Sequence, residues 1–253
     1  HRYTLADGER TTWNFETPVT SLSARERGGF VATIHDGFAF IDFDNERVDV
    51  IRLTEPDLPD NRFNDGKVDG HGRYWAGTMD KLQKSESGTL YRLNPDLSVD
   101  VMDKDYIITN GPAFSKNGKI LYHTDTTKRE IYAFDLSANG DISNKRVWVN
   151  FPEGQGSPDG MTVDNEGCIW VGHFGGSRIT RFSPEGEVVE VIPMPVPNIT
   201  SCTFGGDDLD TLYITTARTG LKDADLEKYP LAGSCLVYKP GVKGLPTPLF
   251  AGE

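Results

Sequence analysis

Asparagine and aspartate side chains recur at the same position relative to a repeated unit of this sequence. Asn64, Asn110 and Asp159 each lie at the same offset before an apolar residue that begins a recurrent unit, and each belongs to an Asn-Gly, Asp-Gly or Asn-Asp-Gly motif. Amide and carboxylate oxygens are hard ligands, which suit Ca²⁺, Mg²⁺ or Mn²⁺. Such motifs are also common in turns, because glycine adopts positive φ and these side chains bond to their own backbone. Their recurrence at one phase favours a shared site.

The recurrent unit consists of an apolar lead-in, a polar turn with Gly or Asp, and a strand that ends in small residues. Its turns are about 43 to 49 residues apart, a period typical of the blades of a β-propeller. The five copies are Leu22 to Asp36, Val68 to Asp80, Phe114 to Thr126, Val163 to Gly175 and Phe204 to Arg218. We interpret each copy as the inner hairpin of a blade.

A second type of hairpin lies between these units, with alternating apolar residues around a polar turn. The six copies are Tyr3 to Phe15, Phe38 to Leu53, Gly88 to Met102, Glu130 to Val149, Arg178 to Pro193 and Cys235 to Phe250. Because a blade has four antiparallel strands, each outer hairpin needs an inner partner, and one inner hairpin is missing.

The hairpin count predicts an all-β fold, a six-bladed β-propeller that forms a single domain over residues 1–253. The first hairpin is of the outer type, so we expect the inner half of the first blade to be missing upstream of residue 1. A five-bladed propeller with an additional hairpin is the alternative. The stretch from Asp223 to Lys228 is expected to be a short helix in the last blade.

The innermost strands of a propeller line a central channel, so the polar residues that precede the inner hairpins are expected to converge near its axis. Other polar residues fit structural roles better. His123 and His173 lie near the ends of inner hairpins without the spacing of a metal-binding pair, and Asp125 and Arg218 are interpreted as partners that join adjacent blades. A GxSxG nucleophile motif is not present in the sequence, which disfavours a serine-triad esterase.

Composition excludes several classes of protein. The formal net charge is −12 and no Lys/Arg cluster occurs, so a nucleic-acid partner is not expected. No apolar run approaches the roughly 18 residues needed to span a bilayer, and the first residues do not resemble a signal peptide. The three cysteines fit neither a disulfide framework nor a zinc motif, so reduced thiols are expected. We therefore expect a soluble, cytoplasmic protein without a membrane partner, as a monomer or weak oligomer.

The sequence resembles the gluconolactonase, regucalcin and senescence-marker-protein family of six-bladed propellers, nearly from end to end. The tracts that carry the resemblance are RFNDGKVD (Arg62 to Asp69), GRYWAGTM (Gly72 to Met79), ITNGPAFS (Ile108 to Ser115), SPDGMTVD (Ser157 to Asp164), SCTFGG (Ser201 to Gly206) and TLYITTAR (Thr211 to Arg218). Tracts such as ITNGP and YHTDT resemble most closely the bacterial sugar lactonases that act on xylonolactone or arabinonolactone.

The resemblance implies that Asn110 and Asp159 are two of three protein ligands to one divalent metal ion. Arg62 and Asn64 would bind substrate. The third ligand in the family is a Glu in a Gly-Glu-Gly-Pro-like motif, which this sequence lacks, so that Glu is expected upstream of residue 1. Oxygen ligands favour Ca²⁺, while Zn²⁺, Mn²⁺ and Fe²⁺ are compatible with a site of three protein ligands.

The chemistry implied is the hydrolysis of an aldonolactone to the aldonic acid. A divalent cation would stabilise the oxyanion or activate water, and Asp159 is the candidate general base. Two alternatives remain. A phosphotriesterase-like or broad-specificity lactonase would be expected to show a more apolar channel mouth than Arg62, Asn64, Asn110 and Asp159 suggest, and a non-catalytic calcium-binding propeller would need no substrate residues.

Overall fold

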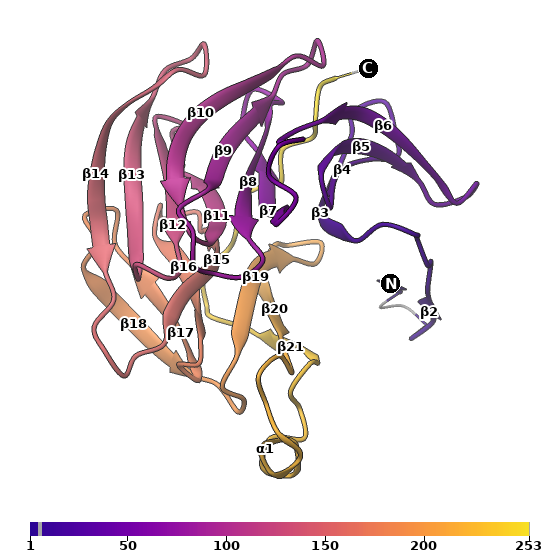
Figure 1. The fold of residues 1–253 in the computed structure, drawn as a ribbon. Coiled ribbons are helices and arrows are strands. Elements are labelled where there is room, and N and C mark those ends of the chain that lie inside the picture. Colours follow the sequence, from indigo (N-terminus) through magenta and orange to yellow (C-terminus); the bar gives the residue numbers. More distant parts are fainter. Residues whose placement is uncertain (5–6, 253) are drawn as a thin grey trace.

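A computed structural model describes residues 1–4 and 7–252, and its strands form a β-propeller (Figure 1). Four sheets are complete four-stranded blades in which neighbouring strands are antiparallel and consecutive in sequence. The first is β3 (Val19–Ala24), β4 (Phe30–Ile34), β5 (Gly37–Asp42) and β6 (Arg47–Leu53), and the second is β7 (Asn61–Val68), β8 (Tyr74–Asp80), β9 (Gly88–Leu93) and β10 (Val99–Tyr106). The third is β11 (Thr109–Phe114), β12 (Ile120–Asp125), β13 (Glu130–Leu136) and β14 (Ile142–Asn150), and the fourth is β15 (Ser157–Val163), β16 (Ile169–Phe174), β17 (Arg178–Phe182) and β18 (Val188–Pro193).

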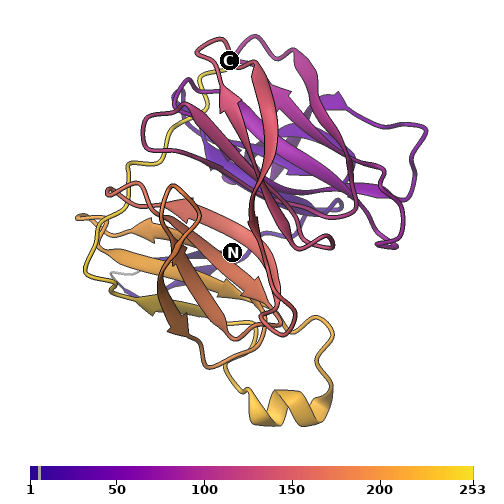
Figure 2. The same ribbon diagram turned by 90° about the vertical axis from the view of Figure 1, so that its left-hand side faces the viewer.

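The fifth blade has three strands, β19 (Ile199–Gly205), β20 (Thr211–Thr216) and β21 (Cys235–Tyr238). Helix α1 (Asp223–Lys228) lies in the connection between β20 and β21, with the bounds that the sequence predicts. Because Thr216 pairs with Ile199, this connection leaves the sheet at the end where the innermost strand begins. The helix therefore projects from that end of the ring (Figures 1 and 2).

The first outer-type hairpin forms a separate two-stranded sheet of β1 (Arg2–Tyr3) and β2 (Arg10–Thr11), with residues 5 and 6 outside the described part of the chain. The prediction of an all-β propeller is confirmed, but the structure has five blades and not the predicted six. The difference arises because each of the five inner hairpins pairs with the outer hairpin that follows it, so no inner strand remains for β1 and β2.

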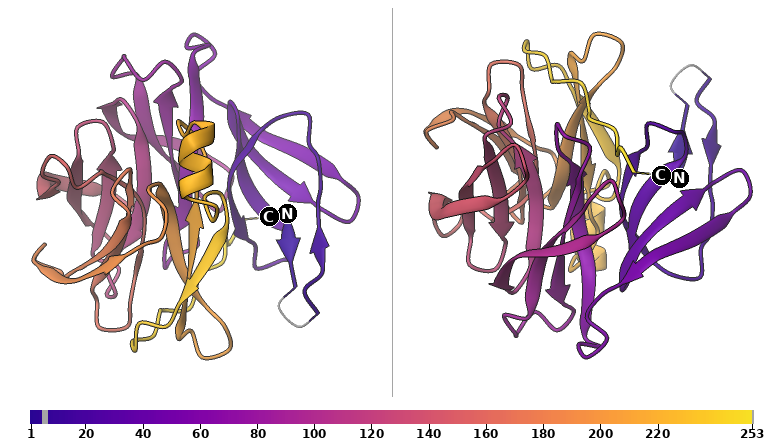
Figure 3. Two further views of the ribbon diagram at one scale, coloured as in Figure 1. Left: turned by 90° about the horizontal axis from the view of Figure 1, so that it is seen from below. Right: turned by 90° about the horizontal axis from the view of Figure 1, so that it is seen from above.

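The blades are arranged around an axis lined by their first strands (Figure 1), and Figure 3 shows the same blades from below and from above. These innermost strands are neighbours in the order β3, β7, β11, β15 and β19. The middle strands are covered on both faces by adjacent blades, so every residue of β8 and β9 is buried, whereas most of β6 is exposed. Tyr122 and Ile131 of the third blade, for example, pack with Met161 and Ile169 of the fourth in one apolar cluster. Apolar contact between blades thus holds the innermost strands in place.

The end of the chain crosses from the fifth blade back to the first. The predicted outer hairpin from Cys235 to Phe250 is formed only in part, because β21 is its sole strand. Gly244 bonds to Leu209 through its N–H, and the chain then continues to Phe250, which forms a parallel bridge with Arg25 beside β3. The ring of Phe250 is fully buried among apolar residues of the first two blades.

All three cysteines are free, in agreement with the sequence, and Cys168 and Cys202 are buried while Cys235 is exposed. Within residues 1–4 and 7–252, no helix is long and apolar enough to cross a membrane.

Candidate functional site

The innermost strands depart from regular pairing at one common level. The register shifts between Phe63 and Gly66 on β7, between Asn110 and Ala113 on β11, and between Pro158 and Met161 on β15. A β-bulge of this kind turns side chains away from the regular alternation of the strand. The sequence predicted the Asn and Asp residues in the connections that precede the strands; they lie instead within the strands, at these bulges.

The glycines of these motifs are explained by close packing between blades. A Cβ atom on Gly66 would lie 2.7 Å from Ser21 Oγ of the first blade, and one on Gly160 would lie 2.3 Å from Ser201 Oγ of the fifth. Gly111 adopts φ +69°, which favours glycine. The Asn-Asp-Gly and Asp-Gly motifs therefore let adjacent innermost strands approach at the channel, and they are not chain-reversing turns.

A chain of hydrogen bonds joins three of the predicted site residues across two blades. Arg62 Nη1 donates to Asn64 Oδ1 at 2.9 Å, and Asn64 Nδ2 donates to Asn110 Oδ1 at 2.9 Å. Asn110 Nδ2 in turn donates to Thr126 Oγ1 at 2.8 Å, and that hydroxyl donates to the carbonyl of Pro158, also at 2.8 Å. Hydrogen bonds on both sides thus orient the amide of Asn110. The last hydrogen bond of this series is accepted by Pro158, the residue before Asp159.

Two carboxylates lie in the channel beside this chain of hydrogen bonds. Asp65 accepts hydrogen bonds from the N–H groups of Gly66 and Gly111, yet burial raises its pKa to about 6, against the opposing charge of Lys67. Burial and the charge of Asp65 raise the pKa of Asp159 well above its ordinary value, with only the N–H of Gly160 opposing. The two carboxylates therefore lie close together, and at Asp65 the effect of burial outweighs the opposing charge of Lys67.

Two cationic side chains flank the carboxylates along β7. Burial lowers the pKa of Arg62, whose guanidinium forms no ion pair with any described residue. Burial also lowers the pKa of Lys67, and its ammonium donates to the carbonyl of Met161 at 2.6 Å. Arg62 lies toward the start of β7 and Lys67 toward its end, so Asp65 lies between them along this strand.

The arrangement fits a divalent cation in part. Asn110 Oδ1 and the Asp159 carboxylate are hard oxygen donors, and a cation would compensate the negative charge that raises the pKa of Asp159. Among the residues that the structure describes, no group of three His, Cys, Asp or Glu side chains is placed to bind a metal ion. The chain thus supplies two predicted oxygen ligands and a second carboxylate nearby, Asp65.

The other polar residues considered from the sequence make contacts that stabilise the fold. The ring of His123 is fully buried and packs edge-on against Tyr106, and His173 bonds to the carbonyl of Gln155 through Nδ1. Asp125 accepts from the N–H of Ile107, in the connection between the second and third blades, which agrees with a role in joining blades. Arg218 instead bonds to Ala232 within the fifth blade.

Sequence reasoning missed three residues of this region. Asp65 was hidden because it sits between Asn64 and Gly66 in a motif that is equally typical of a turn. Its position in the same bulge as Asn64 is a signal that appears only with the strand register. Lys67 and Thr126 lie within the tracts RFNDGKVD and YHTDT, but neither residue was assigned a role from the sequence.

Comparisons with known proteins agree with the geometry. The family model described as "SMP-30/Gluconolactonase/LRE-like region" matches residues 1–218. The 6-deoxy-6-sulfogluconolactonase of Pseudomonas putida is 34% identical over 253 residues, which cover 100% of this chain and 87% of that protein. The regucalcin of Oryctolagus cuniculus is 38% identical over 245 residues, with 94% of this chain and 82% of that protein covered.

A solved structure has the same fold. The crystal structure of a calcium-binding protein, regucalcin, from Agrobacterium tumefaciens superimposes with a TM-score of 0.92 at 26% identity, covering 98% of this chain and 84% of that one.

Proposed function

This chain belongs to the SMP-30/gluconolactonase/LRE-like family, and we propose that it hydrolyses a sugar lactone to the aldonic acid with the help of one divalent metal ion. The family assignment makes the chain a lactone hydrolase. The observation that carries the proposal is the meeting of Asn64, Asn110 and Asp159 at the bulges of three adjacent innermost strands.

A water molecule attacks the lactone carbonyl carbon, the ring C–O bond then breaks, and the proton taken from the water is passed to the ring oxygen, which becomes a hydroxyl group of the aldonic acid. Asp159 is the proposed general base that takes the proton from this water. Burial, the main cause of the raised pKa of Asp159, favours proton uptake by this carboxylate. When bound, a divalent cation supplies electrostatic stabilisation for negative charge on the carbonyl oxygen. In this proposal Asn110 and Asp159 hold the cation, with Ca²⁺ favoured by their oxygen ligands.

Substrate would be bound by Arg62 and Asn64. Only Nη1 of Arg62 donates to described residues, to Asn64 Oδ1 and to the carbonyl of Phe63, which leaves the other guanidinium donors for sugar hydroxyls. A polar and cationic mouth of this kind favours a hydroxyl-rich substrate over a bulky apolar ester. The similarity to 6-deoxy-6-sulfogluconolactonase supports an aldonolactone as the substrate class.

The function is tested by acid release from xylono-, arabinono- and gluconolactone above the spontaneous rate, after chelation and addition of Ca²⁺, Mn²⁺, Zn²⁺ or Fe²⁺. We expect metal-dependent turnover that Arg62→Ala reduces while metal binding is retained. Arg47→Ala is the control, because Arg47 is an exposed residue paired only with Asp49 among the described residues.

Two outcomes would redirect the assignment. Metal binding without turnover of any lactone would favour a calcium-binding propeller. Turnover of phosphotriesters or bulky apolar esters, but not of aldonolactones, would favour the phosphotriesterase-like alternative.

A further inference from the structure

A second cavity lies at the other end of the same channel. It has a volume of about 450 Å³ and is lined by the final residues of β7, β11, β15 and β19, among them Lys67, Phe114, Thr162 and Phe204. Arg62, Asn64, Asn110 and Asp159 belong to the first half of the same strands and do not line it. The volume falls within the range of small-molecule sites in proteins, which is about 300–1,000 Å³.

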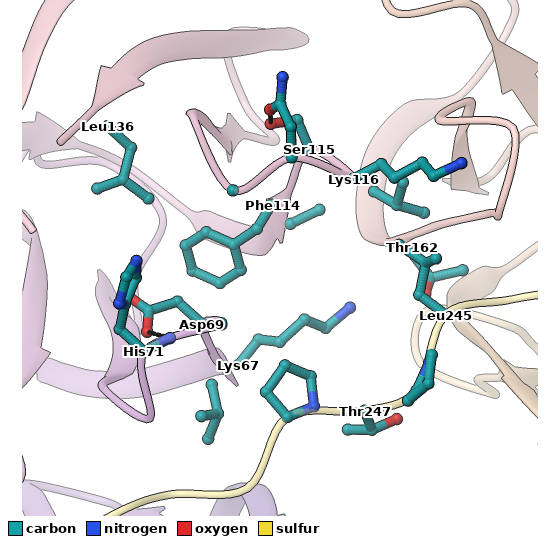
Figure 4. A pocket seen from close by; sticks show the side chains of 18 of the residues that line it. Lys67, Asp69, His71, Phe114, Ser115, Lys116, Leu136, Thr162, Leu245 and Thr247 are labelled. Carbon is teal, nitrogen blue, oxygen red and sulfur yellow. Dashed lines mark hydrogen bonds between the residues drawn. The ribbon is translucent and has the colours of Figure 1, made fainter. Parts of the chain in front are cut away.

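The chain segment from residue 245 to 248 forms one side of this cavity (Figure 4). It is held at both ends, because Gly244 bonds to Leu209 and Phe250 bonds to Ala24 and Glu26. In Figure 4, Lys67 reaches into the space between Phe114 and this segment, with Thr162 on the far side. The cavity therefore has a wall fixed by backbone hydrogen bonds.

The lining combines apolar surface with a cation. Ala113, Phe114, Val163, Phe204 and Leu245 supply the apolar surface. Lys67 uses one N–H to bond the carbonyl of Met161 and makes no other hydrogen bond within the described residues, so two of its three donors remain for a ligand.

The carboxylates near this cation do not bind it directly: Asp65, two residues earlier on β7, acts on Lys67 only through its charge, and Asp69, the single carboxylate of the lining, has other partners. Asp69 is 1% exposed, and it accepts bonds from Arg73 Nε and Trp75 Nε1 on Oδ2. Its other oxygen accepts from the N–H groups of His71 and Arg73, so its charge is already compensated. A second lysine, Lys116, also lines the cavity. In a chain of net charge −12, this cavity is thus a local site for an anion.

We propose that this cavity binds a small carboxylate with an aromatic or aliphatic body, at a site separate from the lactone site. Its carboxylate would accept the free N–H donors of Lys67, and its body would pack on Phe114, Phe204 and Leu245. A charge-assisted hydrogen bond supplies orientation, and the apolar wall supplies burial. A free sugar fits less well, because its hydroxyls would face apolar side chains without partners.

Binding is tested with 3-phenylpropionate as the probe, by calorimetry on the whole chain. We expect a 1:1 complex with a Kd at or below about 1 mM, and at least tenfold weaker binding of 3-phenylpropanamide, which has the same body without the charge. Lys67→Met should weaken binding of the acid at least tenfold. Lys239→Met, an exposed lysine at the outer face of the fifth blade, should leave it unchanged.

A second variant tests the same cavity without touching the cation. Thr162 is partly exposed and lines the space, so Thr162→Phe should fill it and weaken binding at least tenfold, with an unchanged thermal midpoint as evidence of folding. Equal affinity for acid and amide, or binding unaffected by either variant, would overturn the proposal. Competition by gluconate would place the probe in the lactone site and overturn it as well, and inorganic phosphate bound as tightly as the probe would show that the apolar wall is not used.

Discussion

Strands β7 and β15 each carry one aspartate in the channel and another in the turn that follows. Asp69 and Asp164, in the turns, are 1% and 0% exposed, and each accepts four hydrogen bonds. Each also pairs with an arginine, Arg73 or Arg181. Asp65 and Asp159, in the channel, accept hydrogen bonds only from backbone N–H groups.

The difference shows that an aspartate on a strand and one in the turn after it can have different roles. A buried carboxylate with a full set of donors fixes the turn and the tryptophan that donates to it, and it has no free lone pair for chemistry. A buried carboxylate that forms no ion pair costs stability and is available to a metal ion or a proton. We therefore expect the aspartates in the turns to stabilise the fold and those at the bulges to serve the function. Substitutions at both kinds of position can test this.

The largest expected effect is on activity at the channel. Asp159→Asn should reduce lactone hydrolysis by about 10²–10⁴-fold, because the proposed general base is lost while the shape is kept. The variant should be as stable as the parent or more so, since a desolvated charge is removed. The measurements are kcat from initial rates and the thermal midpoint of the chelated protein; near-parental kcat would rule out Asp159 as the base.

The turn should show the opposite pattern. Asp69→Ala leaves the guanidinium of Arg73, which is 6% exposed, without its carboxylate, so we expect a loss of about 3–5 kcal/mol in the free energy of unfolding. Asp65→Ala, four residues earlier and on β7, is the matched control and should cost little or stabilise the fold. Urea denaturation of the two chelated variants measures both, and equal losses would contradict the comparison.

A pH dependence should follow from Asp65. Its pKa is raised from 3.8 to about 6 in the folded protein, so between these values the folded state holds a proton that the unfolded state releases. Its contribution to stability is therefore fully present below the lower value and is lost as the pH rises through about 6. Asp65→Asn should remove this part of the dependence. The difference in urea midpoint between the two chelated proteins should grow from pH 4 to pH 7, and a constant difference would refute the assignment.

The smallest effect is expected at the surface. Lys239 pairs with Asp210 at 3.1 Å, but their side chains are 72% and 41% exposed. Lys239→Met should change the free energy of unfolding by less than about 1 kcal/mol, because solvent screens such a pair. The same urea measurement gives the comparison with Asp69, and a loss as large as that of Asp69→Ala would show that ion pairing without burial is enough.

Most of the fold could be predicted from the sequence because the repeat is local. Each inner hairpin has its own turn glycine and apolar strand, so the units between Val68 and Thr126, for example, correspond to observed hairpins. The last outer hairpin was predicted less well. The segment after β21 follows a long-range path to Phe250, set by packing against the first blade and not by any local pattern.

For the candidate site, the sequence could predict only that its residues occupy equivalent positions in successive repeats. The common offset of Asn64, Asn110 and Asp159 indicated that they converge, but a turn and a bulge have the same Asn-Gly and Asp-Gly signature. Which aspartates keep a compensating partner depends on where the arginine side chains lie: Arg73 pairs with Asp69 within one turn, and Arg181 reaches Asp164 from β17. That information lies in the packing of side chains, which residue spacing does not report.

The path of the last residues has a consequence for how this protein is made. The ring of Phe250 completes the apolar cluster around Phe38 and Phe63, and its backbone closes on β3, yet it is synthesised after every strand of all five blades. Until Phe250 is synthesised, the apolar surface that its ring covers stays exposed on the nascent chain. A released chain that ends within residues 239–249 would have every described strand without this closure, a species open to chaperones and to aggregation.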